Sequence, residues 1–315
     1  MTEPITSFAR LLDPVAPETF FAEVHHRKPL HVPGGADKFA SVMSWDILNE
    51  MLAMDVWDAN TLQLVLDRQR VPPASYSRAV QNRNQRQILQ PDAGKVVELI
   101  GRGASLVLNN IETLHPGCLA VAETIGKRLG AKVSANLYCS WQQHQAFDSH
   151  CDRHDAFALH VVGEKRWQIY EGRLDNPIEH AAFYNVPQAE CDRLKGAVAL
   201  DLTMGPGDLL YLPRGQFHDA LASTEASIHV TFGCNEPTGL DWLSYFWERA
   251  VADSRFRAYL PPPDSPAGEA ALAQHLAMLM DRLKTMALDP QSLAATQAFQ
   301  RGFGVERNPY DLPNL

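Results

Sequence analysis

Short apolar runs divide the middle of this 315-residue chain, and they constrain its fold more than any other feature. Between Val133 and Gly233, apolar and polar residues alternate over a few positions at a time, and Gly, Pro or Asp interrupts each run. Leu209–Leu212 predicts one strand, Pro213–Gly215 a turn, and Ala226–Phe232 a further strand. This pattern is typical of a β-sandwich or β-barrel. We therefore expect an all-β core in this part of the chain.

Helical patterns precede the β region. Pro17–Val24 has an early proline and apolar residues at helical spacing, and Ser44–Leu52 begins with a serine that can cap a helix. Between them, Lys28–Pro33 alternates as a strand does. Gly117–Leu129 places its apolar residues on one helical face. The expected fold class is mainly β with flanking helices.

A second helical region follows Cys234. The pattern predicts one helix over Leu240–Tyr259, a proline-rich break, and another helix around Gly268–Leu288. We therefore predict two parts, a domain over residues 1–235 and a helical region over residues 236–315. The first helix carries an apolar stripe that must be buried, either on the β core or in a homodimer, and it consists of Leu240, Leu243, Phe246, Trp247 and Ala250.

Composition excludes several classes of protein. Hydrophobic residues make up 45% and charged residues 21%, as in ordinary globular proteins. The net charge of −9 argues against direct DNA binding as a main activity. No apolar run is long enough to span a membrane, and the N-terminus lacks the pattern of a signal peptide. Five dispersed cysteines without CxxC spacing favour reduced thiols, so we expect a cytoplasmic protein.

One local exception is a basic stretch without acidic residues between Asp67 and Asp92. It contains Arg68, Arg70, Arg78, Arg83 and Arg86. We interpret it as a solvated loop, with a surface facing an RNA-rich partner as the alternative.

Histidines gather in the segment 149–160, and twelve occur in the whole chain. Residues two apart on a strand project from the same face, so His150 and Asp152 can direct an imidazole and a carboxylate at one point. A third ligand from a distant strand would complete the set of two histidines and one carboxylate found in non-haem Fe(II) oxygenases. His218, just past a predicted turn, is our candidate for it.

Three further histidines compete with His218 for the third ligand position, namely His154, His160 and His229. Only the pair at 150 and 152 has the two-residue spacing at the entrance to a strand.

Several motifs in order resemble the JmjC-type cupin oxygenases of the ribosomal-oxygenase group. They are His150-x-Asp152, Gly163–Trp167 and Gly207–Gly215 followed by x-x-His218, with Phe20–Val32, Leu108–Ile111 and Asn136–Tyr138 upstream. The resemblance covers roughly residues 15–235. It implies a double-stranded β-helix, the jelly-roll of cupin and JmjC domains, that binds Fe(II) and uses 2-oxoglutarate as cosubstrate.

The resemblance also implies roles for individual residues. His150, Asp152 and His218 would be the iron ligands and the catalytic centre. Lys165 would pair with the distal carboxylate of 2-oxoglutarate, and Asn136 and Tyr138 would face the cosubstrate from one strand. His229 lies opposite its apolar neighbours in the strand pattern, so we expect it to face the barrel interior near the cosubstrate or to be an interior histidine without direct contact.

The implied function is a 2-oxoglutarate-dependent dioxygenase that hydroxylates a protein side chain, with a ribosomal protein as candidate substrate. Two departures keep alternatives open. His160 stands where many relatives have glutamine, and residues 236–315 leave little room for the winged-helix unit of larger members. The alternatives are the same chemistry on a small metabolite or free amino acid, and a cupin-like binding protein without turnover.

Overall fold

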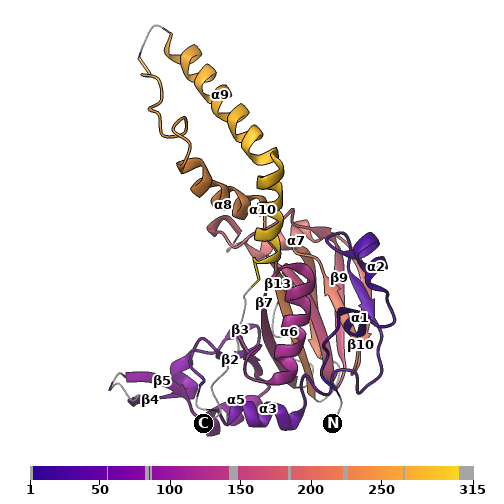
Figure 1. Ribbon diagram of the computed structural model, residues 1–315. Helices are drawn as coiled ribbons and strands as arrows, with labels where there is room; N and C mark the ends of the chain where they lie inside the picture. The colour runs from indigo at the N-terminus through magenta and orange to yellow at the C-terminus, as the bar shows by residue number, and fades with distance from the viewer. Residues whose placement is uncertain are drawn as a thin grey trace, which may run out of the picture. The chain divides into compact units, whose positions relative to one another are not determined.

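The computed structural model describes residues 3–54, 56–81, 85, 87–141, 148–183, 186–222, 226–264 and 267–304 (Figure 1). The chain divides into two compact units. The first comprises Met1–Arg128 and Val133–Asn235, and the second comprises Leu129–Lys132 and Glu236–Leu315.

An eight-stranded sheet forms the centre of the first unit, in the order β1-β11-β8-β13-β7-β6-β2-β3. The strands are β1 (Leu30–Val32), β2 (Leu62–Leu66), β3 (Gln69–Arg70), β6 (Ser105–Leu108), β7 (Lys132–Trp141), β8 (Asp155–Val162), β11 (Leu209–Leu212) and β13 (Ala226–Asn235). The neighbours β1, β11, β8 and β13 pair antiparallel in that order. Strands far apart in sequence therefore lie side by side, as in a jelly-roll.

A second, three-stranded sheet has the order β10-β9-β12. Its strands are β9 (Lys165–Arg173), β10 (Val198–Met204) and β12 (Gln216–Ala222). On β9, Trp167 and Ile169 are buried, whereas Arg166 points outward and pairs with Asp201 of β10. This alternation of two residues is what the sequence pattern predicted.

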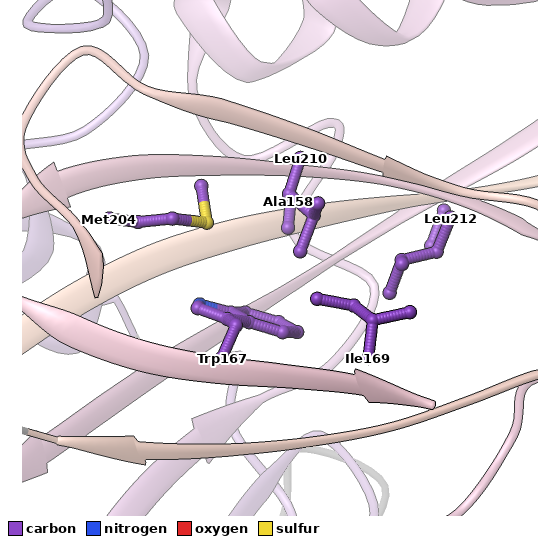
Figure 2. Packing of buried hydrophobic residues seen from close by; sticks show 7 residues of the cluster. Ala158, Trp167, Ile169, Met204, Leu210 and Leu212 are labelled. Atoms are coloured by element: carbon purple, nitrogen blue, oxygen red, sulfur yellow. The ribbon is translucent and has the colours of Figure 1, made fainter. Parts of the chain in front are cut away.

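The core lies between the two sheets (Figure 2). The buried cluster draws on β8, β9, β10 and β11 and consists of Ala156, Ala158, Trp167, Ile169, Met204, Leu210 and Leu212. Burying a large side chain of this kind contributes about 1.5–3 kcal/mol. The small Ala156 and Ala158 leave room beside this cluster, and that room becomes the site described below.

The N-terminal helices cover the other face of β8. They are α1 (Phe8–Leu12), α2 (Pro17–Thr19) and the π-helix η1 (Phe20–Val24). Phe157 of β8 packs against Phe8, Phe20 and Tyr211, with ring centroids 5.0–6.2 Å apart. The central strand is thus buried on both faces, which explains its mostly apolar sequence.

The remaining elements of the first unit are α3 (Trp45–Leu52), α4 (Pro73–Tyr76), β4 (Ser77–Gln81), β5 (Gln87–Pro91), α5 (Ala93–Gly101), α6 (Pro116–Leu129), η2 (Ala181–Phe183) and α7 (Gln188–Leu194). The predictions for α3 and α6 are confirmed, and Ser44 caps α3 by accepting a hydrogen bond from the amide of Ile47. The helix α7 inside the β region was not predicted.

The arginine-rich stretch is not a loop, and that prediction was wrong. Its described residues form β3, α4 and the β4–β5 ribbon, in which Val80 lies opposite Ile88. The ribbon is anchored by Tyr76 and Ser77, both buried. Cross-strand pairing supplies the order here, because the local sequence shows little apolar alternation. Arg83 and Arg86 lie outside the described residues.

The second unit contains α8 (Gly239–Val251), α9 (Gly268–Leu288) and α10 (Pro290–Arg301). Helix α8 ends before the predicted Tyr259, α9 matches its prediction, and α10 was not expected. Within this unit Tyr245 stacks on Phe299 with ring centroids 4.8 Å apart. None of the described helices is both long and apolar enough to cross a bilayer.

The predicted apolar stripe of α8 is mostly uncovered. Phe246 is buried, but Leu240, Leu243 and Trp247 are 56%, 48% and 69% exposed. The described chain therefore does not bury this part of the stripe.

Candidate functional site

The three predicted ligand residues converge at one point. His150 and His218 form an isolated antiparallel bridge in which each amide donates to the other's carbonyl, at 3.0 and 2.9 Å. Oδ2 of Asp152 lies 3.8 Å from Nε2 of His218. One ligand atom from each of the three residues lies within 4.8 Å of the other two.

The segment that carries His150 and Asp152 is extended and leads into β8, which begins at Asp155. Its position is fixed by the turn after β11. The amide of Gly215 donates to the Asp152 carbonyl at 2.7 Å, and the amide of Arg214 donates to the Asp155 carboxylate at 2.8 Å. Gly215 has a φ of 80°, a conformation that side chains rarely adopt. The Pro-Arg-Gly turn of the sequence motif thus holds the backbone of the segment that carries Asp152.

Backbone carbonyls orient both imidazoles. Nδ1 of His150 lies 2.9 Å from the Asp148 carbonyl, and Nδ1 of His218 lies 3.0 Å from the Gln216 carbonyl. A carbonyl only accepts hydrogen bonds, so each Nδ1 carries the proton and each Nε2 keeps its lone pair. This is the tautomer in which histidine binds a metal through Nε2.

The protonation states also favour metal binding. Burial lowers the pKa of His218 to about 4, so its ring is neutral at pH 7. Burial opposes ionisation of Asp152, but the neighbouring His154, His218 and His150 hold the pKa of its carboxyl below the ordinary value. The set therefore offers a neutral His218 and one carboxylate.

A cavity of about 240 Å³ opens beside these ligands. Six of its polar lining residues are those singled out from the sequence, namely Tyr138, His150, Asp152, Lys165, His218 and His229. Asn136 is not in the lining. Its side chain forms a hydrogen bond with the Tyr138 hydroxyl, and its Oδ1 accepts from the amide of Asn110 at 3.2 Å.

Lys165 is the buried cation of this cavity. It is the first residue of β9, and only 5% of it is exposed. Within the part of the chain that the structure describes, no carboxylate forms an ion pair with its ammonium group. Burial lowers the pKa of Lys165 to about 8, so the group is still mostly charged at pH 7. An anionic ligand in the cavity would compensate this charge.

Tyr138 of β7 and His229 of β13 also line the cavity. Their rings stack with centroids 4.9 Å apart and an interplanar angle of 10°, and Trp167 meets His229 edge-on. Burial raises the pKa of Tyr138 to about 12 and places the pKa of His229 well below its ordinary value. Nδ1 of His229 has no hydrogen-bond partner among the described residues. Both groups are therefore neutral and can hydrogen-bond a ligand.

Of the three competing histidines, His229 lines the cavity, whereas His154 and His160 do not. His160 is fully buried, but its Nε2 contacts the Gly163 carbonyl at 2.9 Å and it does not line the cavity. His154 packs against Gly233. Sequence reasoning missed the small lining residues Ala220 and Thr231, although Thr231 follows His229 by two positions on the same strand and the alternation alone could have indicated it.

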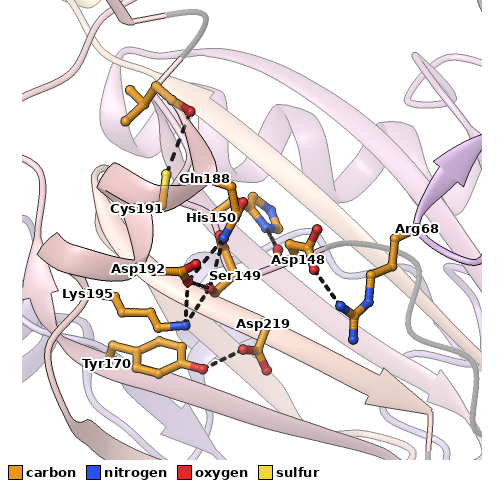
Figure 3. A network of polar contacts seen from close by, with 11 residues as sticks. Arg68, Asp148, Ser149, His150, Tyr170, Gln188, Cys191, Asp192, Lys195 and Asp219 are labelled. Atoms are coloured by element: carbon orange, nitrogen blue, oxygen red, sulfur yellow. Dashed lines mark hydrogen bonds and ion pairs between the residues drawn. The ribbon is translucent and has the colours of Figure 1, made fainter.

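A polar network braces the segment before His150 (Figure 3). Arg68 of the loop between β2 and β3 pairs with the Asp148 carboxylate at 2.9 Å. Lys195 donates to the Ser149 hydroxyl at 2.9 Å, and Gln188 of α7 donates to the Ser149 carbonyl at 3.1 Å. These contacts come from distant parts of the sequence, and no local pattern indicated them.

Two histidines, a carboxylate and a buried lysine in the cavity of a jelly-roll define a metal-binding cupin-type protein. Residues 116–242 match the family model of the JmjC domain, so the chain contains a JmjC domain. The predicted family resemblance and the predicted fold are thereby confirmed.

Two curated relatives illustrate the similarity. The chain is 27% identical over 234 residues to the bifunctional lysine-specific demethylase and histidyl-hydroxylase NO66 of Drosophila persimilis. The matched region covers 71% of this chain and 31% of that protein. The chain is 26% identical over 305 residues to ribosomal oxygenase 2 of Bos taurus, covering 89% of this chain and 61% of that protein. The chain thus spans about a third of the first relative.

Solved structures share the fold. The X-ray structure of E. coli YcfD matches with a TM-score of 0.58 and 18% identity over 88% of this chain and 69% of that one. A structure of the same ribosomal oxygenase in complex with cobalt and 2-oxoglutarate matches with a TM-score of 0.54 and 17% identity over 88% of this chain and 68% of that one.

Proposed function

We propose that this chain is an Fe(II)- and 2-oxoglutarate-dependent dioxygenase that hydroxylates a protein side chain, with a ribosomal protein as the candidate substrate. The observation that carries the proposal is one cavity in which His150, Asp152 and His218 converge beside the buried ammonium of Lys165. The buried ammonium group of Lys165 does not stabilise the fold, because a buried cation without an ion pair is costly.

The donor set suits Fe(II). Nε2 of each histidine and one carboxylate oxygen of Asp152 would hold the metal. Bound there, iron supplies the oxygen chemistry that couples decarboxylation of 2-oxoglutarate to hydroxylation of a C–H bond. The protein's part is to hold the three ligands, through the carbonyls of Asp148 and Gln216 and the amide of Gly215.

The cosubstrate would lie between the metal ligands and Lys165. Its distal carboxylate would pair with the ammonium of Lys165, a charge-assisted contact that removes the cost of burying that cation. Tyr138 can donate its hydroxyl hydrogen, and His229 offers a ring nitrogen without another partner among the described residues. Asn136 acts through Tyr138, because its side chain holds the phenol and does not line the cavity.

Two findings favour a protein substrate. Relatives in the sequence comparison are named histidyl-hydroxylase and ribosomal oxygenase, and YcfD binds cobalt and 2-oxoglutarate on the same fold. The cavity of about 240 Å³ is also smaller than the roughly 300–1,000 Å³ of drug-sized ligand sites. A cavity of this size suits a small dicarboxylate together with the tip of one side chain.

We further propose that the protein acts in the cytoplasm as a homodimer. The exposed Leu240, Leu243 and Trp247 on α8 support the dimer, because a second copy of the same helix would bury them.

The decisive experiment measures succinate release by the purified protein with Fe(II), 2-oxoglutarate and ascorbate, with and without a mixture of ribosomal proteins. We expect release that depends on the mixture, together with a mass increase of one oxygen on one component. The variant His150→Ala should bind less iron and release no succinate. His180→Gln, a change at an exposed histidine outside the cavity, is the matched control and should behave as the wild type.

Three outcomes separate the alternatives. Succinate release stimulated by free amino acids instead of ribosomal proteins would indicate that the substrate is a free amino acid. Binding of iron and 2-oxoglutarate without any release would indicate a binding protein. Release by His150→Ala equal to that of the wild type would refute the assigned metal centre.

A further inference from the structure

A second group of potential metal ligands lies outside the cavity, where the segment after η1 meets the start of β8. It includes His25, His26 and Asp155. His26 adopts a φ of 60°, in the left-handed region that few non-glycine residues occupy. This conformation brings the two successive imidazoles side by side, with centroids 3.8 Å apart and planes tilted by 31°. Neighbouring side chains in an extended segment would point apart.

The group is separate from the proposed iron site. Residues on β8 alternate between its two faces, and Ala156 and Ala158 line the cavity. Asp155 therefore projects to the opposite face, which it shares with Phe157. On that face Phe157 packs against Tyr211 and the N-terminal helices.

The distances suit a small divalent cation. Nε2 of His25 and Nε2 of His26 lie 3.9 and 3.6 Å from Oδ2 of Asp155, and all three ligand atoms lie within 4.8 Å of one another. Ligands bound tetrahedrally to Zn²⁺ at about 2.0–2.2 Å are about 3.4 Å apart. Movements of a few tenths of an ångström at the side chains would complete the geometry.

Hydrogen bonds already orient the carboxylate. Tyr211 donates its hydroxyl hydrogen to Oδ2 of Asp155, and the amide of Arg214 donates to Oδ1 at 2.8 Å. The Tyr211 hydroxyl in turn accepts from the amide of His26 at 3.0 Å. Metal-binding carboxylates are held in this way by an outer set of hydrogen bonds. Asp155 is only 3% exposed, whereas His26 is 52% exposed and gives a cation access from solvent.

We propose that His25, His26 and Asp155 bind a Zn²⁺ ion. Two imidazoles and one carboxylate form a donor set that zinc accepts. The ion would neutralise a buried carboxylate and fasten the segment after η1 to the beginning of β8. The site needs neither the iron ligands nor 2-oxoglutarate.

Cobalt titration of the metal-free protein tests the proposal, because tetrahedral Co²⁺ is read by its visible absorption and the stoichiometry by elemental analysis. We expect two equivalents bound by the wild type. The variant His25→Gln/His26→Gln should bind one, and His150→Ala/His218→Ala should bind one with the tetrahedral spectrum retained. Zn²⁺ should still raise the Tm of the latter variant, in which the proposed iron ligands are missing.

The outcomes distinguish this site from the iron site. A single equivalent that the His150→Ala/His218→Ala variant loses would refute the zinc site, as would two equivalents in His25→Gln/His26→Gln. A single equivalent lost only in His25→Gln/His26→Gln would support the zinc site and contradict the iron site. Should the double variant fail to fold, the single change of the exposed His26 to Gln gives the same comparison, with His180→Gln as control.

Discussion

Replacing Lys165 with methionine is expected to make the metal-free protein more stable and, at the same time, a poorer binder of 2-oxoglutarate. Lys165 is 5% exposed, and burial lowers its pKa from 10.5 to about 8. A shift of this size corresponds to a penalty of about 3 kcal/mol for the charged form in the folded state. Methionine fills a similar volume without the charge, so we expect a gain in stability at pH 7 of up to about 3 kcal/mol.

The same penalty gives a pH dependence of definite sign. Below pH 8 the lysine is charged in both the folded and the unfolded chain, and the folded state carries the full cost of burial. Between about pH 8 and 10.5 the unfolded chain binds the proton and the folded chain does not, so Lys165 contributes a rise in the free energy of unfolding with pH. Urea denaturation at pH 7 and pH 9.5 measures this contribution, which should be absent in Lys165→Met.

The functional effect has the opposite direction. A hydrogen bond to a charged partner is worth about 1.5–3 kcal/mol, so the KM for 2-oxoglutarate should rise about 10- to 150-fold in Lys165→Met while the iron content stays unchanged. Lys127→Met, a change at an exposed lysine that pairs with Glu123, is the matched control. A less stable Lys165→Met protein with an unchanged KM would refute the argument, because Lys165 would then be a structural residue.

Three further sets of substitutions test the ion pair before His150, the turn after β11 and the exposed face of α8. Arg68→Ala removes an exposed ion pair to Asp148. Because such pairs are worth at most about 1 kcal/mol, iron affinity should fall about fivefold or less with the Tm unchanged. Complete loss of iron would contradict this expectation. Gly215→Ala places a methyl group 2.0 Å from the Leu174 carbonyl oxygen, at a residue with a φ of 80°. Urea denaturation should therefore show that the free energy of unfolding falls by at least about 2 kcal/mol. Equal stability of the variant and the wild type would show that the turn relaxes freely. Leu243→Glu/Trp247→Glu should give a monomer in analytical ultracentrifugation, an expectation that a monomeric wild type would overturn.

The sequence alone predicted the β core and the family. Short apolar runs bounded by turn residues placed strands at Leu209–Leu212 and from Ala226 onward, because a strand inside a sheet buries side chains on one or both of its faces. The ordered motifs around His150, Asp152 and His218 pointed to the JmjC domain, and the match of residues 116–242 confirmed it. These signals are local, or they depend on short motifs whose order along the chain can be read directly.

Other features were decided by tertiary structure. The order of the arginine-rich stretch comes from pairing between β4 and β5, and the exposure of Trp247 depends on which faces the helices leave uncovered. The sequence could not show that Arg68 braces the segment before His150, because this ion pair joins residues 80 positions apart. Asn136 and Tyr138 lie on one strand, but only the structure shows that Asn136 bonds the Tyr138 hydroxyl instead of lining the cavity.

The proximity of His25 and His26 to Asp155 was also decided by tertiary structure. Two adjacent histidines and a distant aspartate carry no spacing signal, and they meet only because a left-handed residue and the start of β8 lie together in the fold. What the sequence by itself determined was therefore the periodic core and the motif residues. Tertiary structure decided which side chains share a cavity, since long-range packing brings them together and leaves no trace in local periodicity.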